Sequence, residues 1–445
     1  MKSSVCILVA CLVWLFVEVS VAELQIFKKL RAAERFVEDL NRGEFDAVVQ
    51  NVSSTMSQHL NVLSNVITVL AANNTACNQS AEIEYLRDLS VSINQKLDDV
   101  ISQFQTVKIL AHWNESIYAK YETTIHAVFN QFKLLFMVPS VGINHQEQLF
   151  VKEYERTYPV GGDHLFLGFA IGNGFISPAM NYTKHNRGQM RTFMLNILKP
   201  LIMAADIEVV YSTIARSDTV ILSTINRWQA RFEAVQRDMK EIDLDLKNNY
   251  ITQANKDIDI FSNNNLELSN PMFARFLYQE LSKKYFWRDW LVVVSTHTEG
   301  YHDAHSRTCN GVIKSTHNRK DLVIDSVDKD KTPLNIQYVI QTCKSLQISC
   351  NITVRTTINT CSNEDPTETR RIRSQSGVIY HSANADVVFN WITKFGTSCS
   401  PISSYGVIDT HKNPVHYAAG PTDDSPNRLF VCDLGVCNYF VHFFG

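Results

Sequence analysis

The side chains best suited to chemistry gather in one polar stretch. His297, Glu299, His302 and His305 follow an apolar run at 290–294 that predicts a buried strand. Two histidines three residues apart can share a face and, with a third histidine or a carboxylate, bind a metal such as zinc. Polar loops that leave strands are more often solvated or hydrogen-bonded caps. We therefore expect no metal ion, with His297, His302 and His305 as the residues to examine for one.

Motifs of the common enzyme classes are missing from the sequence. It has no G-x-S-x-G elbow, no H-E-x-x-H and no P-loop, and the Gly-Asn-Gly triplet at 172–174 lacks the third glycine of a dinucleotide loop. Asp325, Asp328 and Asp330 lack the glycine and the final glutamate of an EF-hand. The sequence predicts a protein that is not an enzyme and needs no cofactor.

An apolar, glycine-containing segment at 165–176 carries no charged residue. Its simplest interpretation is burial within the protein. The alternative is a concealed membrane-inserting element, too short to span a bilayer as a helix but long enough to enter one as a hairpin tip or as part of an oligomeric pore. The membrane candidates are Leu165, Phe166, Leu167, Phe169, Ile171, Phe175 and Ile176.

The first residues have the pattern of a secretory signal peptide. Lys2 precedes an uncharged apolar run at 5–17, and small residues at 20–22 predict cleavage before Glu23. A membrane anchor is disfavoured because this run is shorter than the roughly 20 residues of a spanning helix. We expect a secreted, extracellular protein with residues 1–22 removed.

Glycosylation sequons agree with export. N-x-Ser/Thr sequences begin at Asn51, Asn73, Asn78, Asn114, Asn181 and Asn351. Five of these six lie before residue 200, which predicts a large solvated surface in that half.

The cysteines also agree with export. Outside the signal peptide they are Cys77, Cys309, Cys343, Cys350, Cys361, Cys399, Cys432 and Cys437. An even number in an exported chain predicts disulfides, whose pairing the sequence leaves open. Seven lie in the last third, so Cys77 pairs with that region, is free, or bridges two chains. Zinc is disfavoured because no C-x-x-C pair occurs.

Apolar spacing predicts helices over residues 23–286, interrupted by an apolar, glycine-rich insert at 160–180. The clearest seam, with steps of four and three, is Ile221, Ile225, Trp228, Phe232, Val235, Met239, Ile242 and Leu246. This spacing predicts a long helix packed in coiled-coil fashion on a partner. Lone amphipathic helices are marginal in water, so we expect an elongated antiparallel bundle.

The pattern changes at Trp287. From there β-branched stretches alternate with turns, which predicts a cysteine-rich α+β or β domain over 287–445. The net charge of −3 gives no field to attract nucleic acid.

A family resemblance begins at the same point. Residues 283–294, with the sequence KKYFWRDWLVVV, are followed by Gly300, His302, His305 and the Cys-x-Gly at 309–311. This stretch resembles secreted rapunzel-like and cephalotoxin-like animal proteins. The resemblance implies a non-enzymatic extracellular protein, toxin-like in some members, with no catalytic residue to carry over. The cysteine-rich tail after about residue 335 is not part of the pattern.

We therefore expect a mostly α N-terminal elongated helical bundle, with the plan of an α-pore-forming toxin, and a small disulfide-containing α+β or β C-terminal domain. The leading functional hypothesis is a toxin-like protein that acts at a cell surface or membrane through an inserted apolar tongue. The alternative is an extracellular binding or structural protein that recognises a partner through its C-terminal domain. Expected partners are a cell-surface protein, a glycan or a lipid membrane, without nucleic acid; self-association into a homo-oligomer is left open.

Overall fold

A computed structural model describes a defined set of residues. They are 32–33, 35–40, 42–72, 118–138, 142–158, 161–170, 174–215, 218–296, 304–308, 313–317, 320–332, 335, 337, 339, 341, 389–390, 404–409, 416–419, 429–434 and 439–445. The signal peptide lies outside this set, as do Asn73, Asn78, Asn114, Asn351 and every cysteine of the mature chain except Cys432, which is in a strand. The predictions of export and disulfides therefore stay predictions.

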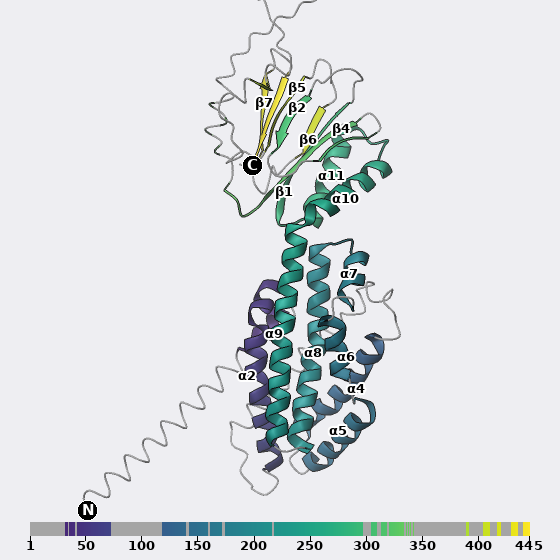
Figure 1. Cartoon of the computed structure of the whole chain (residues 1–445), viewed down its shortest axis with the longest axis vertical. Helices are drawn as coiled ribbons and strands as arrows, with labels where there is room; N and C mark the ends of the chain where they lie inside the picture. The colour runs from purple at the N-terminus through teal and green to yellow at the C-terminus, as the bar shows by residue number, and fades with distance from the viewer. Residues whose placement is uncertain are drawn as a thin grey trace, which may run out of the picture. The chain divides into compact units, whose positions relative to one another are not determined.

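The chain divides into two compact units, Met1–Asn248 and Asn249–Gly445. The helices described in the first are α2 (Phe45–Ala72), α4 (Tyr118–Met137), α5 (Ile143–Thr157), α6 (Gly161–Ala170), α7 (Ile176–Tyr182), α8 (Arg187–Ala215) and α9 (Asp218–Asn248) (Figure 1). The prediction of a helical bundle is confirmed for this part of the chain.

Helix α8 is the central element of the first unit. It packs against α2, α4, α5, α6 and α9, and every residue from Phe193 to Ser212 is buried. A helix that is apolar on all sides needs neighbours on all sides, which the surrounding helices supply. Its burial includes Lys199, Asp206 and Glu208, and these charges lie within the core.

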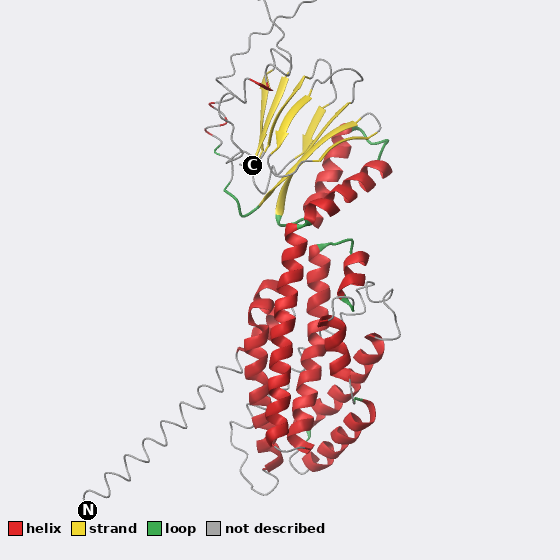
Figure 2. Cartoon of the chain, in the orientation of Figure 1, coloured by secondary structure: helices red, strands yellow, loops and turns green. Residues whose placement is uncertain are grey.

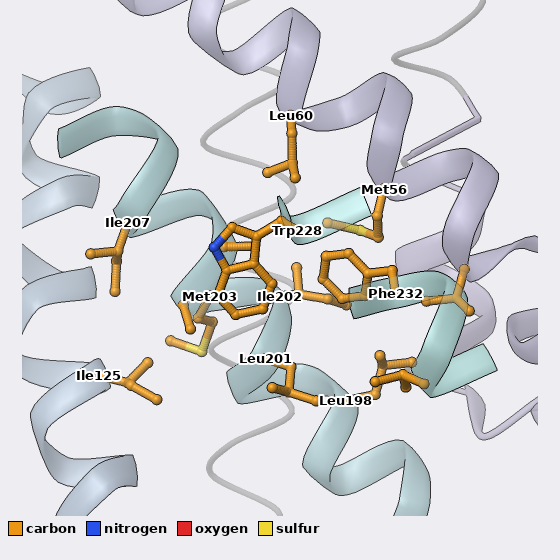
Figure 3. Close-up of a cluster of buried hydrophobic side chains, with 14 of the residues drawn as sticks. Met56, Leu60, Ile125, Leu198, Leu201, Ile202, Met203, Ile207, Trp228 and Phe232 are labelled. Atoms are coloured by element: carbon orange, nitrogen blue, oxygen red, sulfur yellow. The ribbon is translucent and has the colours of Figure 1, made fainter. Parts of the chain in front are cut away.

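Helix α9 carries the seam that the sequence predicts. Ile225, Trp228, Phe232, Val235, Met239 and Leu246 are buried, while Ile221 and Ile242 are partly buried against the same core. Figure 3 shows Trp228 and Phe232 of this seam among Met56 and Leu60 of α2 and Ile202 and Met203 of α8. The four-three spacing therefore identified both the helix and its buried face.

In the second unit, the described elements are helices α10 (Tyr250–Asn264) and α11 (Asn270–Lys284) and eight strands. The strands are β1 (Arg288–Thr296), β2 (Ala304–Thr308), β3 (Ile313–His317), β4 (Lys320–Asp328), β5 (Ser404–Asp409), β6 (His416–Ala419), β7 (Leu429–Leu434) and β8 (Tyr439–Phe444). They form two four-stranded sheets, ordered β3-β4-β1-β6 and β2-β5-β8-β7, with antiparallel pairing throughout (Figure 2).

Strand β1 is buried on both faces because two different layers cover it. Trp290, Val292 and Val294 point into a cluster with side chains of α10 and α11. The alternate residues Leu291 and Val293 pack with Phe444 of β8 in the other sheet. Since side chains of a strand alternate between faces, the apolar run at 290–294 serves both layers.

The division of the chain differs from the one expected from sequence. The sequence places the boundary after residue 286, where the helices end, whereas the compact units divide between Asn248 and Asn249. The physical reason is that α11 packs on β1 and β6, and α10 packs on α11 and β3. Both helices therefore belong to the unit that contains the sheets.

Candidate functional site

The apolar segment singled out in the sequence, 165–176, covers the C-terminal part of α6 and reaches the first residue of α7, with 171–173 outside the described residues. We call residues 161–182 the α6–α7 segment. Within it, Leu165, Phe169 and Ile176 are buried, Phe166 and Phe175 are partly buried against the core, Leu167 is 46% exposed, and Ile171 lies outside the described residues. Helix α6 packs on α4, α8 and α9. The described part of the segment is therefore docked on the bundle, while Leu167 of α6 remains largely exposed to solvent.

Close contacts at two glycines join the C-terminal part of α6 to the residues just before α7. The backbone N–H of Phe175 donates a 2.7 Å hydrogen bond to the carbonyl of Gly168. A Cβ atom on Gly168 would overlap the Phe175 ring, and one on Gly174 would overlap the Gly168 carbonyl. Glycine is needed at position 174 because a Cβ there would overlap backbone atoms, whereas a Cβ at position 168 would force the Phe175 ring to move.

The first turn of α6 rests on a buried carboxylate. A Cβ atom on Gly162 would lie 2.5 Å from Oε1 of Glu208 and 2.6 Å from the hydroxyl of Tyr158. A Cβ atom at position 162 would therefore force the side chains of Glu208 and Tyr158 to shift. The start of α6 and the carboxylate of Glu208 are thus in direct contact.

Glu208 is 5% exposed and accepts three hydrogen bonds. Nε1 of Trp228 donates at 2.8 Å and Nη2 of Arg227 at 2.6 Å, both to Oε2, and the hydroxyl of Tyr158 donates at 3.3 Å to Oε1. Burial raises the pKa of Glu208 above its ordinary value, although Arg227 and the indole N–H act in the opposite direction. The carboxylate therefore has hydrogen-bond donors on both oxygens, but it has lost most of its contact with water.

A second ionic contact ties α6 to α9. Arg231 pairs with Asp163 of α6, and its guanidinium lies 5.1 Å from the ring centre of Phe166 and 4.7 Å from that of Trp228. Nη1 of Arg231 is buried and has no hydrogen-bond partner among the described residues. Helix α6 is therefore held by one ion pair, a cation–π contact and its buried apolar side chains.

A separate buried pair joins α2 to α8. Nε2 of His59 lies 3.0 Å from Oδ1 of Asp206, and both residues are buried. Burial alone would lower the pKa of His59, but the charge and hydrogen bond of Asp206 outweigh it and raise that pKa. Nδ1 of His59 and Oδ2 of Asp206 lack hydrogen-bond partners among the described residues.

Of the three histidines considered as metal ligands, the structure describes His305. His305 lies in β2, where it pairs with Val407 of β5, while His297 and His302 fall outside the described residues. Within the described part of the chain, no three His, Cys, Asp or Glu side chains form a group able to hold a metal ion. The prediction about these three histidines is left untested.

Two of the predicted glycosylation asparagines can be placed. Asn51 lies in α2 and Asn181 in α7, and both side chains are exposed. Cys432 lies in β7, opposite Val441 of β8. The use of either sequon and the pairing of the cysteines stay predictions.

The aromatic motif that carries the family resemblance has a structural role. Arg288 donates to Ser326 through Nε at 2.8 Å, pairs with Asp328 at 2.7 Å, and lies 4.2 Å from the ring centre of Tyr250. Tyr285 lies against Trp290, with ring centres 5.4 Å apart. The motif thus fastens the start of α10 and the end of α11 to β1 and β4.

Sequence reasoning found the α6–α7 segment but missed the polar contacts beneath it. The signal available was the charge of Lys199, Asp206 and Glu208 within the otherwise apolar stretch 193–214. These charges argue against a membrane span, and no helix in the described part of the chain has the length and apolar character that crossing a bilayer requires. The partners of Asp206 and Glu208 come from α2, from α9 and from Tyr158, which follows α5, and the sequence does not reveal them.

Comparison of the chain with curated proteins and with solved structures finds no match. Comparison with family models finds one over residues 75–267, which contain helices α4 to α10. This range ends before the aromatic motif at 283–294, so the likeness extends to the helical part of the chain. The expected resemblance is confirmed: residues 75–267 match the cephalotoxin-like middle helical domain.

Proposed function

We propose that this chain is a secreted, non-enzymatic, toxin-like protein that acts at a cell surface or membrane by releasing and inserting the α6–α7 segment. The observation that carries the proposal is the way α6 is docked. It is a short apolar helix placed against α4, α8 and α9 by Leu165, Phe169 and the Asp163–Arg231 ion pair. The cephalotoxin-like match supports the toxin-like part.

The energy of release is moderate. Exposing the three buried large apolar side chains of the segment, Leu165, Phe169 and Ile176, costs roughly 4.5–9 kcal/mol in total, and a partly exposed ion pair adds about 0–1 kcal/mol. Transfer of the same side chains, together with Leu167, into a bilayer would return that apolar contribution. A membrane can therefore compete with the bundle for α6.

The size of the segment limits how it can act. Ten helical residues extend about 15 Å, half of the ~30 Å hydrocarbon core. A single α6 would enter one leaflet, and passage across the membrane would need several copies or further segments. Insertion in one leaflet or as part of an oligomer is the form that we propose.

Export and the oxidised state of the cysteines belong to the same proposal. They rest on the signal-peptide pattern, the sequons and the even number of cysteines after residue 22.

The second candidate function is partner recognition by the second unit. The observation in its favour is that two sheets and two helices give this unit a core of its own.

A dye-release assay tests the membrane function. Purified protein is added to phosphatidylcholine vesicles, with and without phosphatidylserine, and loss of the entrapped dye is followed. We expect dye release by the wild type and at least tenfold less release by Leu167→Glu, because the added charge opposes entry of α6 into the bilayer. Leu167 is exposed, so the substitution leaves the core unchanged.

The matched control is Leu244→Glu, which places the same charge at an exposed leucine of α9. It should release dye as the wild type does. If the wild type releases no dye from either vesicle, or if the two variants behave alike, membrane insertion of the α6–α7 segment is refuted and partner recognition becomes the leading function.

A further inference from the structure

We propose that the docking of α6 is linked to the uptake of a proton at Glu208, so that acid holds the segment closed and rising pH favours its release. The proposal gives the α6–α7 segment of the proposed function a regulation. It concerns the docking equilibrium itself, which can be measured without a membrane.

The geometry places Glu208 where docking must affect it. Its carboxylate lies under the first turn of α6, with Oε1 2.5 Å from the position that a Cβ of Gly162 would take. When α6 is docked, Glu208 is 5% exposed. Departure of α6 uncovers this side of the carboxylate and admits water.

Three physical effects then act in one direction. Docking removes water from the carboxylate, which disfavours its charged form. Docking also brings the negative charge of Asp163 near Glu208, and it engages Arg231 in the ion pair with Asp163. After undocking, Glu208 regains water and is no longer close to the carboxylate of Asp163. Arg231 stays near Glu208, and its guanidinium is no longer paired with Asp163. Each change favours the charged form in the open state.

The remaining groups that face Glu208 change little between the two states. Arg227 and Trp228 belong to α9 and stabilise the charged carboxylate whether or not α6 is present. Tyr158 follows α5 and donates to Oε1, and Tyr154 of α5 also lies near; burial raises the pKa of both phenols, so they stay neutral. On its own helix, Tyr211 donates to Glu155.

The sign of the linkage follows from the raised pKa. A carboxyl whose pKa is higher in the docked state contributes stability to that state below its open-state pKa, and this contribution is lost as pH rises through the docked-state value. One linked proton changes the docking equilibrium by at most about tenfold per pH unit.

Hydrogen exchange on the full chain measures the docking equilibrium. Exchange of peptides covering α6 is followed by mass spectrometry in steps from about pH 4.5, near the ordinary pKa of a glutamate, to about pH 8 and corrected for the intrinsic effect of pH on exchange. We expect the protection of α6 to fall severalfold across this range, while peptides from the buried seam of α9 keep theirs.

Substitution of Glu208 assigns the effect. Glu208→Gln imitates the protonated side chain, so α6 should stay protected and show no dependence on pH. The matched control Glu155→Gln changes an exposed carboxylate of α5 and should keep the wild-type slope. A flat wild-type profile, or a Glu208→Gln variant with the wild-type slope, overturns the proposal.

A gentler variant covers the case in which Glu208→Gln does not fold. Arg227 is half exposed and stabilises the charged carboxylate, so Arg227→Gln should move the loss of α6 protection to higher pH. An unchanged midpoint overturns the assignment to Glu208.

The dye-release assay tests the membrane function separately. If the protection of α6 depends on pH but no dye is released, the linkage stands and the membrane function is refuted. Dye release with a flat exchange profile refutes the linkage alone.

Discussion

Trp228 and Glu208 meet between α9 and α8, where the indole Nε1 donates a 2.8 Å hydrogen bond to the carboxylate. Trp228 is fully buried and belongs to the apolar seam of α9, so this is a directed polar contact inside a hydrophobic interface. Apolar side chains tolerate several relative positions of two helices, whereas a buried hydrogen bond tolerates few. The pair therefore helps to set the register of α9 on α8, and with it the surface on which α6 rests.

Removal of the indole donor should destabilise the first unit. Trp228→Phe keeps an aromatic ring but leaves a buried carboxylate with one donor fewer, which costs roughly 1–3 kcal/mol beyond the loss of packing. The loss of unfolding free energy is measured by urea unfolding, in which the hydrogen-exchange protection of α9 reports on the first unit. A double-mutant cycle with Glu208→Gln should show coupling between the two positions; strictly additive effects would contradict the contact.

Added methyl groups on the glycines of α6 should loosen its docking. Gly162→Ala and Gly168→Ala place a Cβ against Glu208 and Phe175, respectively. We expect each to weaken α6 protection by about tenfold or more, corresponding to the ~1–3 kcal/mol typical of overpacking. Gly142→Ala is the control, because its Cβ meets only Val138 at an ordinary 3.6 Å. Equal effects at all three positions would disprove the tight approach.

The His59–Asp206 pair should make stability fall as pH rises. Because the pKa of His59 is raised in the folded state, its contribution is complete below the ordinary value of about 6.5 and is lost as pH rises through the raised value. We expect the midpoint of thermal unfolding to drop between pH 6.5 and 8 in the wild type, and to drop less in His59→Gln.

Three other groups affect stability in or near that pH range. Burial raises the pKa of Glu208, so its contribution is also lost as pH rises, and this part of the slope remains in His59→Gln. Burial lowers the pKa of Lys199 to about 8, so Lys199 adds stability only as pH rises above that value. Burial also lowers the pKa of His126, which therefore costs stability only below about pH 6.5. His164→Gln, an exposed histidine of α6, is the control and should keep the wild-type slope. An equal slope in His59→Gln would show that the pair does not titrate.

In the second unit, Arg288 should not tolerate replacement by lysine. Arg288→Lys keeps the charge but loses the planar fork that reaches Ser326 and Asp328 together. We expect a loss of about 1–3 kcal/mol in urea unfolding of this unit. Lys283→Met, an exposed cation of the same motif, should stay within about 0.5 kcal/mol of the wild type. Similar losses in both variants would argue against the contacts of Arg288.

The sequence by itself determined the features that depend on neighbouring residues. The four-three spacing from Ile221 to Leu246 identified α9 and its buried face, and the apolar run at 290–294 identified β1. The uncharged stretch at 165–176 located the α6–α7 segment. Each of these patterns follows from the repeat of a helix or strand, which is a local property of the chain.

Only the tertiary structure decided which distant residues meet. It paired His59 with Asp206 across 147 positions and Arg231 with Asp163 across 68, and it placed α10 and α11 in the unit of the sheets. An amphipathic helix buries its apolar face equally well on another helix or on a sheet, so periodicity cannot name the partner. The contact of Gly162 with Glu208 has the same origin: a glycine shows that the backbone can come close, and only the packed structure shows what it approaches.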